Sequence, residues 1–564
     1  MKRFLLFLLL CTQVAVAQTN LQYPAAKKVA LGKKGMVVCA HPLAAQIGMD
    51  ILKKGGNAVD AAIAVQFALA VVYPQAGNIG GGGFMLYRNP DGKTVATDYR
   101  ETAPAKASKN MYLDFKSDVI PDISRRGALA AGVPGSVAGM VDAFQKFSRL
   151  KNWNVLIEPA IDLAKNGFVI TTQEATNLNN LKKEFLKYNH HSTAFTKDSV
   201  WKPGQILVQK SLANTLKRIK KNKRDGFYTG KTADFIVQEM QKGNGIISQQ
   251  DLRAYQVKER PVIHFNYKGY EITSMAPPSS GGIALLQLMK MIEPFPIQSW
   301  GFHDPRTVHL IAEAERRVYA DRSKHLGDSD FYPVPLDGLR DSLYLANRML
   351  NFDANQATPS TSIQPGKPII EKEQTTHLSI VDEFGGAVSL TTTLNDSYGS
   401  KTVVAGAGFI LNNEMDDFSV KPGAPNMYGL IGGEANSIQA GKRMLSSMTP
   451  TVVCKDGRLI LVVGTPGGST IITSVLQTII NVLDFKMKVE DAVQAPRFHH
   501  QWLPDQISIE KKTFSVETRN ALTKLGHLLV ERDNIGRVEA IFIAADGTIT
   551  GAADIRGDDT ASGF

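Results

Sequence analysis

The chain has 564 residues, of which 43% are hydrophobic and 21% are charged, and its formal net charge is +11 at pH 7. This composition excludes an intrinsically disordered protein, and the length allows either three or four ordinary domains or one large α/β unit. The densest basic run, Lys217 to Arg224, leads into Gly226-Phe227-Tyr228 without a basic face interleaved with exposed aromatics, so we expect a solvated helix end and no nucleic-acid partner.

The first residues predict a secretory signal peptide. Met1-Lys2-Arg3 precede the apolar run from Phe4 to Leu10, and Ala15-Val16-Ala17 places small residues before the expected cut. A membrane anchor is the alternative, but the apolar stretch is shorter than the roughly 20 residues that a spanning helix needs. We expect residues 1–17 to be removed on export, and the mature protein to be secreted to the periplasm without a membrane span.

Two cysteines, Cys39 and Cys454, remain when the signal segment with Cys11 is removed. They could form at most one disulfide, and the sequence leaves open whether they pair. The stability of the fold must therefore come from packing. This is typical of a periplasmic enzyme with a large core rather than of a small disulfide-rich domain.

Helix and strand patterns alternate along the whole chain. Apolar stretches interrupted by polar residues predict buried helices at 61–72, 283–292 and 470–482. Alternating β-branched and polar residues predict strands at 84–87, 377–381, 387–394 and 459–463. No internal repeat of 20 to 50 residues is present, so the pattern indicates a mixed α/β protein.

The segment from Asp353 to Gln374 has a different composition, with three prolines among Ser, Thr and Asn and no apolar period. We expect an exposed connector there. It ends at Thr375-Thr376-His377, where a strand pattern begins. A flexible stretch that leads into a strand is typical of a cleavage site, although an ordinary linker has the same pattern.

Conventional catalytic motifs are absent from the sequence. Gly135-Ser136-Val137-Ala138-Gly139 places its serine one position too early for a nucleophile elbow. The adjacent pairs His190-His191 and His499-His500 lack the spacing of helical zinc ligands, and the glycine run Gly80 to Gly83 precedes a strand rather than a helix. We therefore expect neither a metal nor a cofactor.

Eight segments together resemble the γ-glutamyltranspeptidase family, in the family's order and over nearly the whole mature chain. They are Asn57 to Ala62, Pro74 to Gly83, Arg100 to Pro104, Pro277 to Gly282, Thr375 to His377, Asn412 to Phe418, Leu445 to Pro450 and Gly464 to Gly468. The resemblance implies an N-terminal-nucleophile (Ntn) hydrolase fold, an αββα sandwich in which two stacked β-sheets lie between helical layers. It also implies that the precursor cuts itself between Gln374 and Thr375, giving a heterodimer of a large subunit, 18–374, and a small catalytic subunit, 375–564.

By this resemblance Thr375 is the nucleophile, and the chemistry explains why it must start a chain. A threonine hydroxyl needs an adjacent base, and a new α-amine with a pKa of about 7.7–8.0 can take its proton. Thr393 matches the hydroxyl that supports the nucleophile in the family. Gly467 and Gly468 match the oxyanion hole, whose N–H groups stabilise the charge on the carbonyl oxygen.

The remaining family positions form the expected substrate pocket. Arg100, Ser446 and Ser447 match the residues that bind the α-carboxylate of a γ-glutamyl group. The matches for the α-ammonium side are Asn395, Glu414 and Asp417, and Glu414 is glutamine in some members. Tyr428 matches the aromatic residue of a lid loop found in some bacterial members, which would close over the pocket.

These matches predict an enzyme that takes the γ-glutamyl group from glutathione or a related amide and gives it to water, an amino acid or a dipeptide. One alternative is an acylase for glutaryl or cephalosporin side chains, but Asp417 has no use in a site for groups that lack the ammonium. Another alternative is an inactive, uncleaved binding protein, and the retention of Thr375, Thr393, Gly467 and Gly468 argues against it. The sequence leaves open the balance of hydrolysis and transfer.

Overall fold

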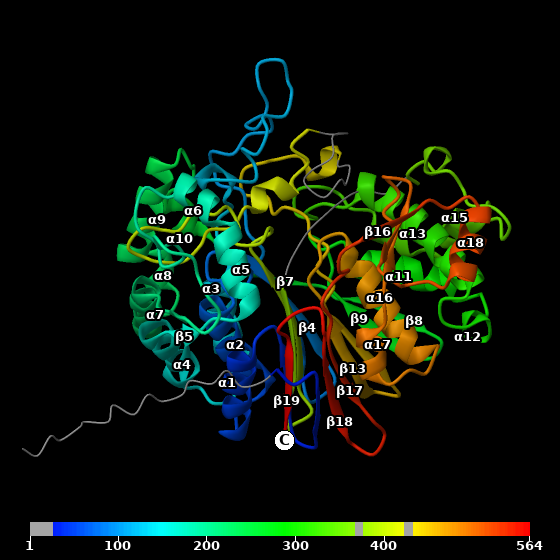
Figure 1. The fold of residues 1–564 in the computed structure, drawn as a ribbon, viewed down its shortest axis with the longest axis horizontal. Coiled ribbons are helices and arrows are strands. Elements are labelled where there is room, and N and C mark those ends of the chain that lie inside the picture. Colours follow the sequence, from blue (N-terminus) through cyan, green and yellow to red (C-terminus); the bar gives the residue numbers. More distant parts are fainter. Residues whose placement is uncertain (1–25, 367–375, 422–432) are drawn as a thin grey trace, which may run out of the picture.

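The structure is a computed structural model, which describes residues 26–366, 376–421 and 433–564. The expected signal peptide, the expected cleavage junction with Thr375, and Tyr428 lie outside these ranges. In the described residues, two large sheets face each other and helices cover the outer side of each (Figure 1). The expected αββα arrangement is confirmed, and the chain forms one large unit rather than several separate domains.

Both large sheets are antiparallel throughout and contain seven strands each in the described part of the chain. The first sheet has the order β1 (Val29–Gly32), β18 (Ile549–Ala553), β17 (Glu539–Ile543), β13 (Arg458–Gly464), β12 (Thr451–Lys455), β9 (Tyr270–Ser274) and β8 (Ile263–Tyr267). The second has the order β19 (Thr560–Gly563), β2 (Met36–Cys39), β10 (Thr376–Val381), β11 (Ala387–Thr393), β3 (Gly82–Arg88), β4 (Thr94–Asp98) and β7 (Lys258–Arg260). The sheets meet through β10 and β11 on one side and β13 and β17 on the other.

Two groups of helices form the outer layers. The second sheet is covered by α1 (Pro42–Lys53), α2 (Ala58–Val72) and α3 (Ser136–Phe147), with α4 (Trp153–Asn166) and α7 (Lys210–Asn222) packed behind them. The first sheet is covered by α11 (Gly281–Ile292), α16 (Thr470–Leu483) and α17 (Val489–Gln494), with α13 (Pro305–His325) packed on α11. None of the helices in the described ranges combines the length and the apolar character that a membrane crossing requires.

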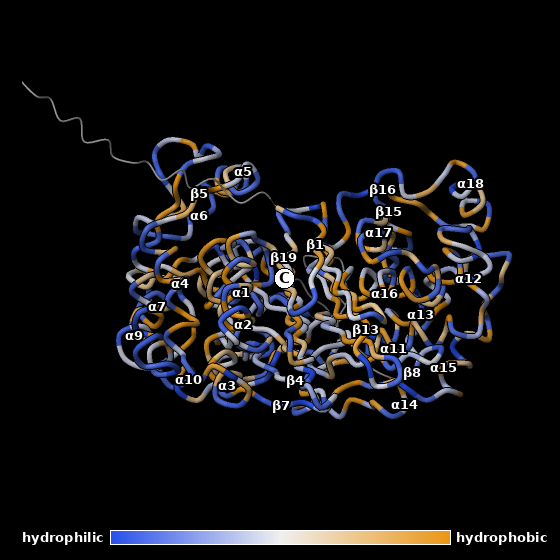
Figure 2. Tube along the Cα trace, turned by 90° about the horizontal axis from the view of Figure 1, so that it is seen from below, coloured by the Kyte–Doolittle hydropathy of each residue, from blue (hydrophilic) through white to orange (hydrophobic). Residues whose placement is uncertain are grey.

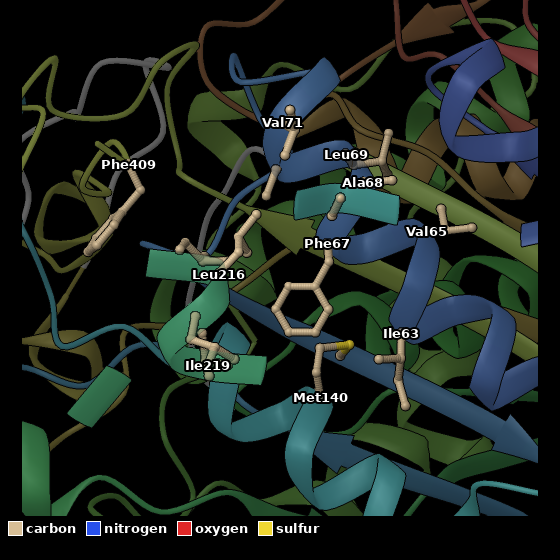
Figure 3. Close-up of a cluster of buried hydrophobic side chains, with 14 of the residues drawn as sticks. Ile63, Val65, Phe67, Ala68, Leu69, Val71, Met140, Leu216, Ile219 and Phe409 are labelled. Atoms are coloured by element: carbon tan, nitrogen blue, oxygen red, sulfur yellow. The ribbon is translucent and has the colours of Figure 1, made fainter. Parts of the chain in front are cut away.

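The sequence explains why α2 lies at the centre of its layer. Asn57 caps its first turn by accepting from the Asp60 N–H, while the Asp60 carboxylate accepts from the Asn57 N–H. Every residue of the helix is buried, which is typical of a helix that is apolar on all sides. Figure 3 shows Phe67 of this helix packed near Met140 of α3 and Ile219 of α7. Replacing such a buried ring by alanine costs about 3–5 kcal/mol of stability.

The second helical layer has a comparable core. Leu285 of α11, Ile472 and Ile479 of α16, and Val308 of α13 are all fully buried in one cluster. Figure 2 shows apolar residues in both helical layers and polar residues along much of the periphery. Each sheet therefore buries one face against the other sheet and the opposite face against helices.

Most expectations about local structure are confirmed. The three predicted helices are α2, α11 and α16, and the four predicted strands are β3, β10, β11 and β13. The basic run occupies the exposed end of α7 and the turn after it. Residues 353–366 of the expected connector contain only one short helical turn and are mostly exposed. Cys39 lies in β2 and Cys454 in β12, and both thiols are free.

Candidate active site

The start of β10 and the end of β11 lie side by side. Thr376, which follows Thr375 directly in the chain, pairs with Thr392 of β11. The next residue, Thr393, ends β11, and its Oγ1 accepts from the Asn395 N–H at 2.7 Å. The structure therefore brings the predicted residues Thr393 and Asn395 together at the strand end that adjoins the expected cleavage junction. Thr375 itself is outside the described residues.

The glycine run before β3 holds this strand end in place. A Cβ on Gly81 would lie 1.9 Å from the carbonyl oxygen of Thr393, so only glycine allows the two backbones to approach so closely. The side chain of Asn78 donates to the same carbonyl at 2.8 Å. The run is a close-packing element beside Thr393.

Gly467 and Gly468 form the turn between β13 and α16, as the sequence predicts. Their φ angles are +143° and +65°, values that favour glycine. Their carbonyls accept from the N–H groups of Thr470 and Ile471 in the first turn of α16. Within the part of the chain that the structure describes, neither glycine N–H donates to an acceptor. A negative oxygen placed there would meet two unused donors at a helix N-terminus.

Arg100, Glu414 and Asp417 form one buried charge cluster. Arg100 Nη2 lies 2.6 Å from Asp417 Oδ2, and Nη1 lies 2.7 Å from Glu414 Oε2. All three side chains are at most 1% exposed. The carboxylates come from the short helix η3 (Glu414–Asp417), which lies in the yellow part of the chain at the top of Figure 1. Residues predicted from two separate motifs therefore meet at one point.

A fourth charged residue, Glu101, completes this cluster and was not predicted. Its Oε2 lies 3.1 Å from Arg100 Nη1. Burial, reinforced by the nearby Glu414 carboxylate, raises the pKa of Glu101 well above its usual range. Among the described residues, the Arg100 guanidinium faces the carboxylates of Glu414 and Asp417 as well.

The carboxylates of the cluster retain hydrogen-bonding capacity. Glu414 Oε2 is close to Arg100, but its orientation does not make a hydrogen bond, and neither oxygen of Glu414 has a hydrogen-bond partner among the described residues. Buried acceptors without donors are rare in folded proteins. A ligand with N–H donors would satisfy them.

Ser446 and Ser447 lie on a segment braced against the motif at 277–282. The Ser446 carbonyl accepts from both the N–H and the Oγ of Ser280, at 2.6 and 2.8 Å. Ser279 Oγ donates to the Met448 carbonyl at 2.6 Å. Arg100 reaches the same segment through Nε, which donates to the Met444 carbonyl at 3.2 Å. The serines are thus adjacent to the guanidinium that they were predicted to accompany.

Asparagines connect the parts of the site. Asn413 accepts through its carbonyl from the Asn395 side chain at 3.0 Å, which links Asn395 to the helix with Glu414. Asn436 donates to the Asp417 carbonyl at 2.6 Å and accepts from the Leu445 N–H at 3.3 Å. Asn436 therefore ties the segment that carries Asp417 to the serine segment, and no motif pointed to it.

Helix α13 contributes two residues that sequence reasoning missed. Arg322 donates to the hydroxyls of Ser280 and Ser447, and Tyr319 donates to the Ser469 carbonyl beside the glycine turn. The helix has charged residues on all sides and would be expected to lie at the surface, yet Arg322 is 3% exposed. No signal in a single sequence separates such a buried arginine from a solvated one.

His377, from the motif that follows the expected cleavage point, packs between the two sheets. Its ring contacts Thr391 Oγ1 at 2.9 Å and Ser379 Oγ at 3.0 Å, and it is fully buried. Burial lowers the pKa of His377 to about 3. The ring is therefore neutral and structural rather than a general base.

One group of side chains in the described ranges has the composition of a metal site: His309, Glu313 and His527. Glu313 already forms ion pairs with Arg316 and Arg317, and His309 contacts His527 directly at 2.7 Å between ring nitrogens. Two adjacent guanidinium groups oppose the binding of a cation. The group stabilises α13 against the connector and the segment around His527.

A cavity of about 220 Å³ adjoins the site on the side of the glycine turn. It is lined by Asn395 and Gly467 from the site, together with Ser397, Asn534 and Arg537 among others. The Arg537 guanidinium is held by Asp559 at 2.7 and 3.0 Å. The cavity thus lies next to both a predicted substrate residue and a predicted oxyanion donor.

Comparisons with known proteins agree with this geometry. The family profile of the γ-glutamyltranspeptidases matches residues 44–564. The chain is 46% identical over 536 residues to a glutathione hydrolase proenzyme of Escherichia coli strain K12, covering 94% of this chain and 92% of that protein.

Solved structures agree as well. A cephalosporin acylase from Bacillus halodurans superposes with a TM-score of 0.84 at 25% identity, over 96% of this chain and 98% of that one. A Helicobacter pylori γ-glutamyltranspeptidase has a TM-score of 0.57 at 45% identity, over 58% of this chain and 94% of that one. The predicted Ntn-hydrolase fold and the predicted resemblance are confirmed, and the chain belongs to the γ-glutamyltranspeptidase family.

Proposed function

We propose that this chain is a self-processing glutathione hydrolase and γ-glutamyltransferase. It cleaves itself between Gln374 and Thr375, and the resulting subunits, 18–374 and 375–564, remain together as a heterodimer. Residues 1–17 direct it to the periplasm and are removed. The observation that carries the proposal is the buried cluster of Arg100, Glu414 and Asp417 beside Ser446 and Ser447.

The cluster has the charges needed to recognise a γ-glutamyl group. Arg100 and the two serines supply donors to the α-carboxylate, and Glu414 and Asp417 supply acceptors to the α-ammonium. Both oxygens of Glu414 have no hydrogen-bond donor among the described residues, and an ammonium would bring such donors, which supports this role. Asn395, joined to Asn413, adds an amide on the same side. Tyr428 would lie on the lid that covers the bound group.

The chemistry then proceeds in two steps. The α-amine of Thr375 takes the proton of the threonine hydroxyl, and the oxygen attacks the γ-carbonyl. The N–H groups of Gly467 and Gly468 stabilise the negative oxygen, while Thr393 supports the nucleophile. The C–N bond then breaks, the leaving amine takes the proton, and a γ-glutamyl ester of Thr375 remains.

In the second step, water or the amine of an amino acid or dipeptide attacks the ester. The proton of the attacking group passes to the α-amine, and the amine gives it to the threonine oxygen as the ester C–O bond breaks, which releases the product and restores the threonine hydroxyl. The leaving amine and the incoming acceptor would bind in the 220 Å³ cavity beside Gly467 and Asn395. The position of this cavity next to a predicted oxyanion donor supports this assignment. Water would compete with an amine acceptor for the same ester.

The acylase alternative fits the pocket less well. A glutaryl group has the carboxylate but not the ammonium, so it would leave Glu414 and Asp417 without a positive partner from the ligand. Desolvated carboxylates without such a partner cost binding energy. The similarity to the glutathione hydrolase proenzyme, at 46% identity against 36% for an acylase proenzyme of Pseudomonas sp. strain SE83, supports the same choice.

The test is an assay of the purified protein with γ-glutamyl-p-nitroanilide and with glutaryl-p-nitroanilide, each with and without glycylglycine. We expect release of nitroaniline from the γ-glutamyl compound and an increase with glycylglycine. Activity on the glutaryl compound alone would establish the acylase alternative, and no activity on either compound would favour the inactive binding protein.

A further inference from the structure

Arg322 approaches the carboxylate side of the proposed pocket from a separate element, the last turn of α13. Its Nη2 donates to Ser447 Oγ and its Nε donates to Ser280 Oγ at 3.1 Å. The guanidinium is also 5.6 Å from the centre of the Tyr319 ring, one turn earlier on the same helix. The arginine is therefore held by both serines and by the ring, and it is almost completely buried.

The donor and acceptor roles at Ser447 follow from the chemistry of the two groups. A guanidinium carries only donors, so in this contact the serine oxygen must be the acceptor. A hydroxyl has a single hydrogen, and with Arg322 on one lone pair that hydrogen points elsewhere. Among the residues that the structure describes, Ser447 Oγ donates to none. The contact therefore presents Ser447 as a hydrogen-bond donor.

The second contact fixes the position of the serine as well as its orientation. Ser280 Oγ accepts from Arg322 and itself donates to the Ser446 carbonyl at 2.8 Å. The arginine thus joins two neighbouring points of the segment that carries both serines. A displaced segment would lose both bonds at once.

We propose that Arg322 is a positioning residue, which fixes the Ser447 hydroxyl as a donor to the α-carboxylate of the γ-glutamyl group. This inference rests on the function proposed above. Its effect is specific, because it acts only on a substrate that has the α-carboxylate. A purely structural role of Arg322 would instead affect all substrates equally.

The test is a double-mutant cycle of Arg322→Met and Ser447→Ala in the processed enzyme. Two anilides are compared: the γ-glutamyl compound and 4-aminobutyryl-p-nitroanilide, which has the same chain and ammonium but no carboxylate. Lys324→Met is the control, because Lys324 is exposed and lies two residues away on the same helix.

We expect each single variant to raise KM for the γ-glutamyl anilide by about tenfold to hundredfold, the range for a hydrogen bond to a charged group, while kcat changes much less. The double variant should be no worse than Ser447→Ala, because both changes remove the same interaction. Arg322→Lys should recover part of the loss, and Lys324→Met should match the wild type. On the 4-aminobutyryl anilide, Arg322→Met and the wild type should have equal kcat/KM.

Losses that multiply in the double variant, or equal losses on both anilides, would contradict the proposal. If Arg322→Met does not process or fold, the same cycle is run with Arg322→Lys, which keeps the charge but loses the planar guanidinium that reaches both serines. Multiplying losses there would contradict the proposal equally. A wild-type enzyme that is inactive on the γ-glutamyl anilide would refute the proposed function, and the positioning role with it.

Discussion

The guanidinium of Arg100 and the carboxylate of Asp417 lie 2.6 Å apart, and water reaches neither of them. A γ-glutamyl group carries the same two charges in the opposite sense, a carboxylate for Arg100 and an ammonium for Asp417. In the function proposed above, the pair would be a preformed complement of the substrate's zwitterionic end. A buried ion pair of this kind adds little to the stability of the fold, because the cost of desolvating the two charges offsets much of their attraction. We therefore expect its main contribution to be to substrate specificity.

Replacing Asp417 by Asn tests this complementarity. The substitution keeps the shape but removes the charge that the ammonium needs, so we expect kcat/KM for γ-glutamyl-p-nitroanilide to fall by about tenfold to hundredfold. The value for glutaryl-p-nitroanilide should not fall. Glu434→Gln is the matched control, because Glu434 is exposed and pairs with Lys109 at the surface. An equal loss on both anilides would mean that Asp417 has a structural role.

Glu101 should tolerate neutralisation. Folding raises the pKa of this carboxyl above its usual value of 4.5. The folded protein therefore loses stability as the pH rises above 4.5, because the carboxyl ionises first in the unfolded chain. Glu101→Gln removes this penalty, so its thermal midpoint should equal or exceed that of the wild type at pH 8, with no difference below about pH 4.5. Activity should change by less than about threefold. A lower midpoint at pH 8 would show that the ionised form stabilises the fold.

Gly467→Ala should affect the chemical step. The added Cβ would lie 2.6 Å from Thr470 Oγ1, and the φ of +143° is unfavourable for alanine, so the turn and its N–H groups must shift. We expect kcat to fall by about 100-fold or more, the scale of losing an oxyanion donor, with little change in KM. Gly457→Ala also has a positive φ but open space around it, and should keep kcat. Equal effects of both changes on kcat would argue against the oxyanion role.

Filling the cavity beside Gly467 should separate transfer from hydrolysis. Asn534 is exposed at its rim, so Asn534→Trp can occupy the space without breaking the Arg537 and Asp559 pair. We expect the KM for glycylglycine to rise by about tenfold while hydrolysis of the donor stays within about twofold. Asn222→Trp, at the exposed end of α7, is the control. Unchanged transfer would place the acceptor elsewhere.

The enzyme should lose stability in acid. Burial lowers the pKa of His41, His377, His499 and His527 to about 3. Unfolded histidines bind protons below about pH 6.5, so each group stabilises the native state above that pH, and this contribution is lost as the pH falls from 6.5 towards 3. At pH 5.5 the loss is on the order of 1 kcal/mol per histidine.

Thermal midpoints at pH 7.5 and 5.5 measure this effect. His377→Gln should show a smaller drop between the two pH values than the wild type, because one of the titrating groups is gone. His190→Gln should show the same drop as the wild type, since His190 is exposed. A midpoint that is independent of pH in the wild type would contradict the account.

Local patterns predicted the elements whose own sequence decides their structure. The apolar stretch of α2 and the β-branched residues of β10 and β11 are strong signals, because these elements are buried along their whole length. The stacking of the sheets and the meeting of Arg100 with Asp417 depend on contacts between residues that are 317 positions apart, and only the family resemblance could supply them.

The residues that hold the predicted site residues in place had no recognisable pattern in the sequence. Arg322, Asn436 and Glu101 are polar residues of ordinary appearance, and their importance comes from burial that the sequence does not display. In α13 the buried residues include Glu315, Arg317 and Asp321, so the charges that normally indicate a solvent-facing helix are misleading there. Tertiary pairing of charges overrides the helical pattern in such an element.

The central claim is that Thr375 becomes a chain terminus and acts as the nucleophile. The most direct measurement is the mass of the purified wild type and of Thr375→Ala. We predict two fragments for the wild type, 18–374 and 375–564, with a γ-glutamyl adduct on the smaller one after brief exposure to the γ-glutamyl anilide, and a single uncleaved chain for the variant. An active wild type that remains one intact chain, or an adduct on any other residue, would contradict the mechanism.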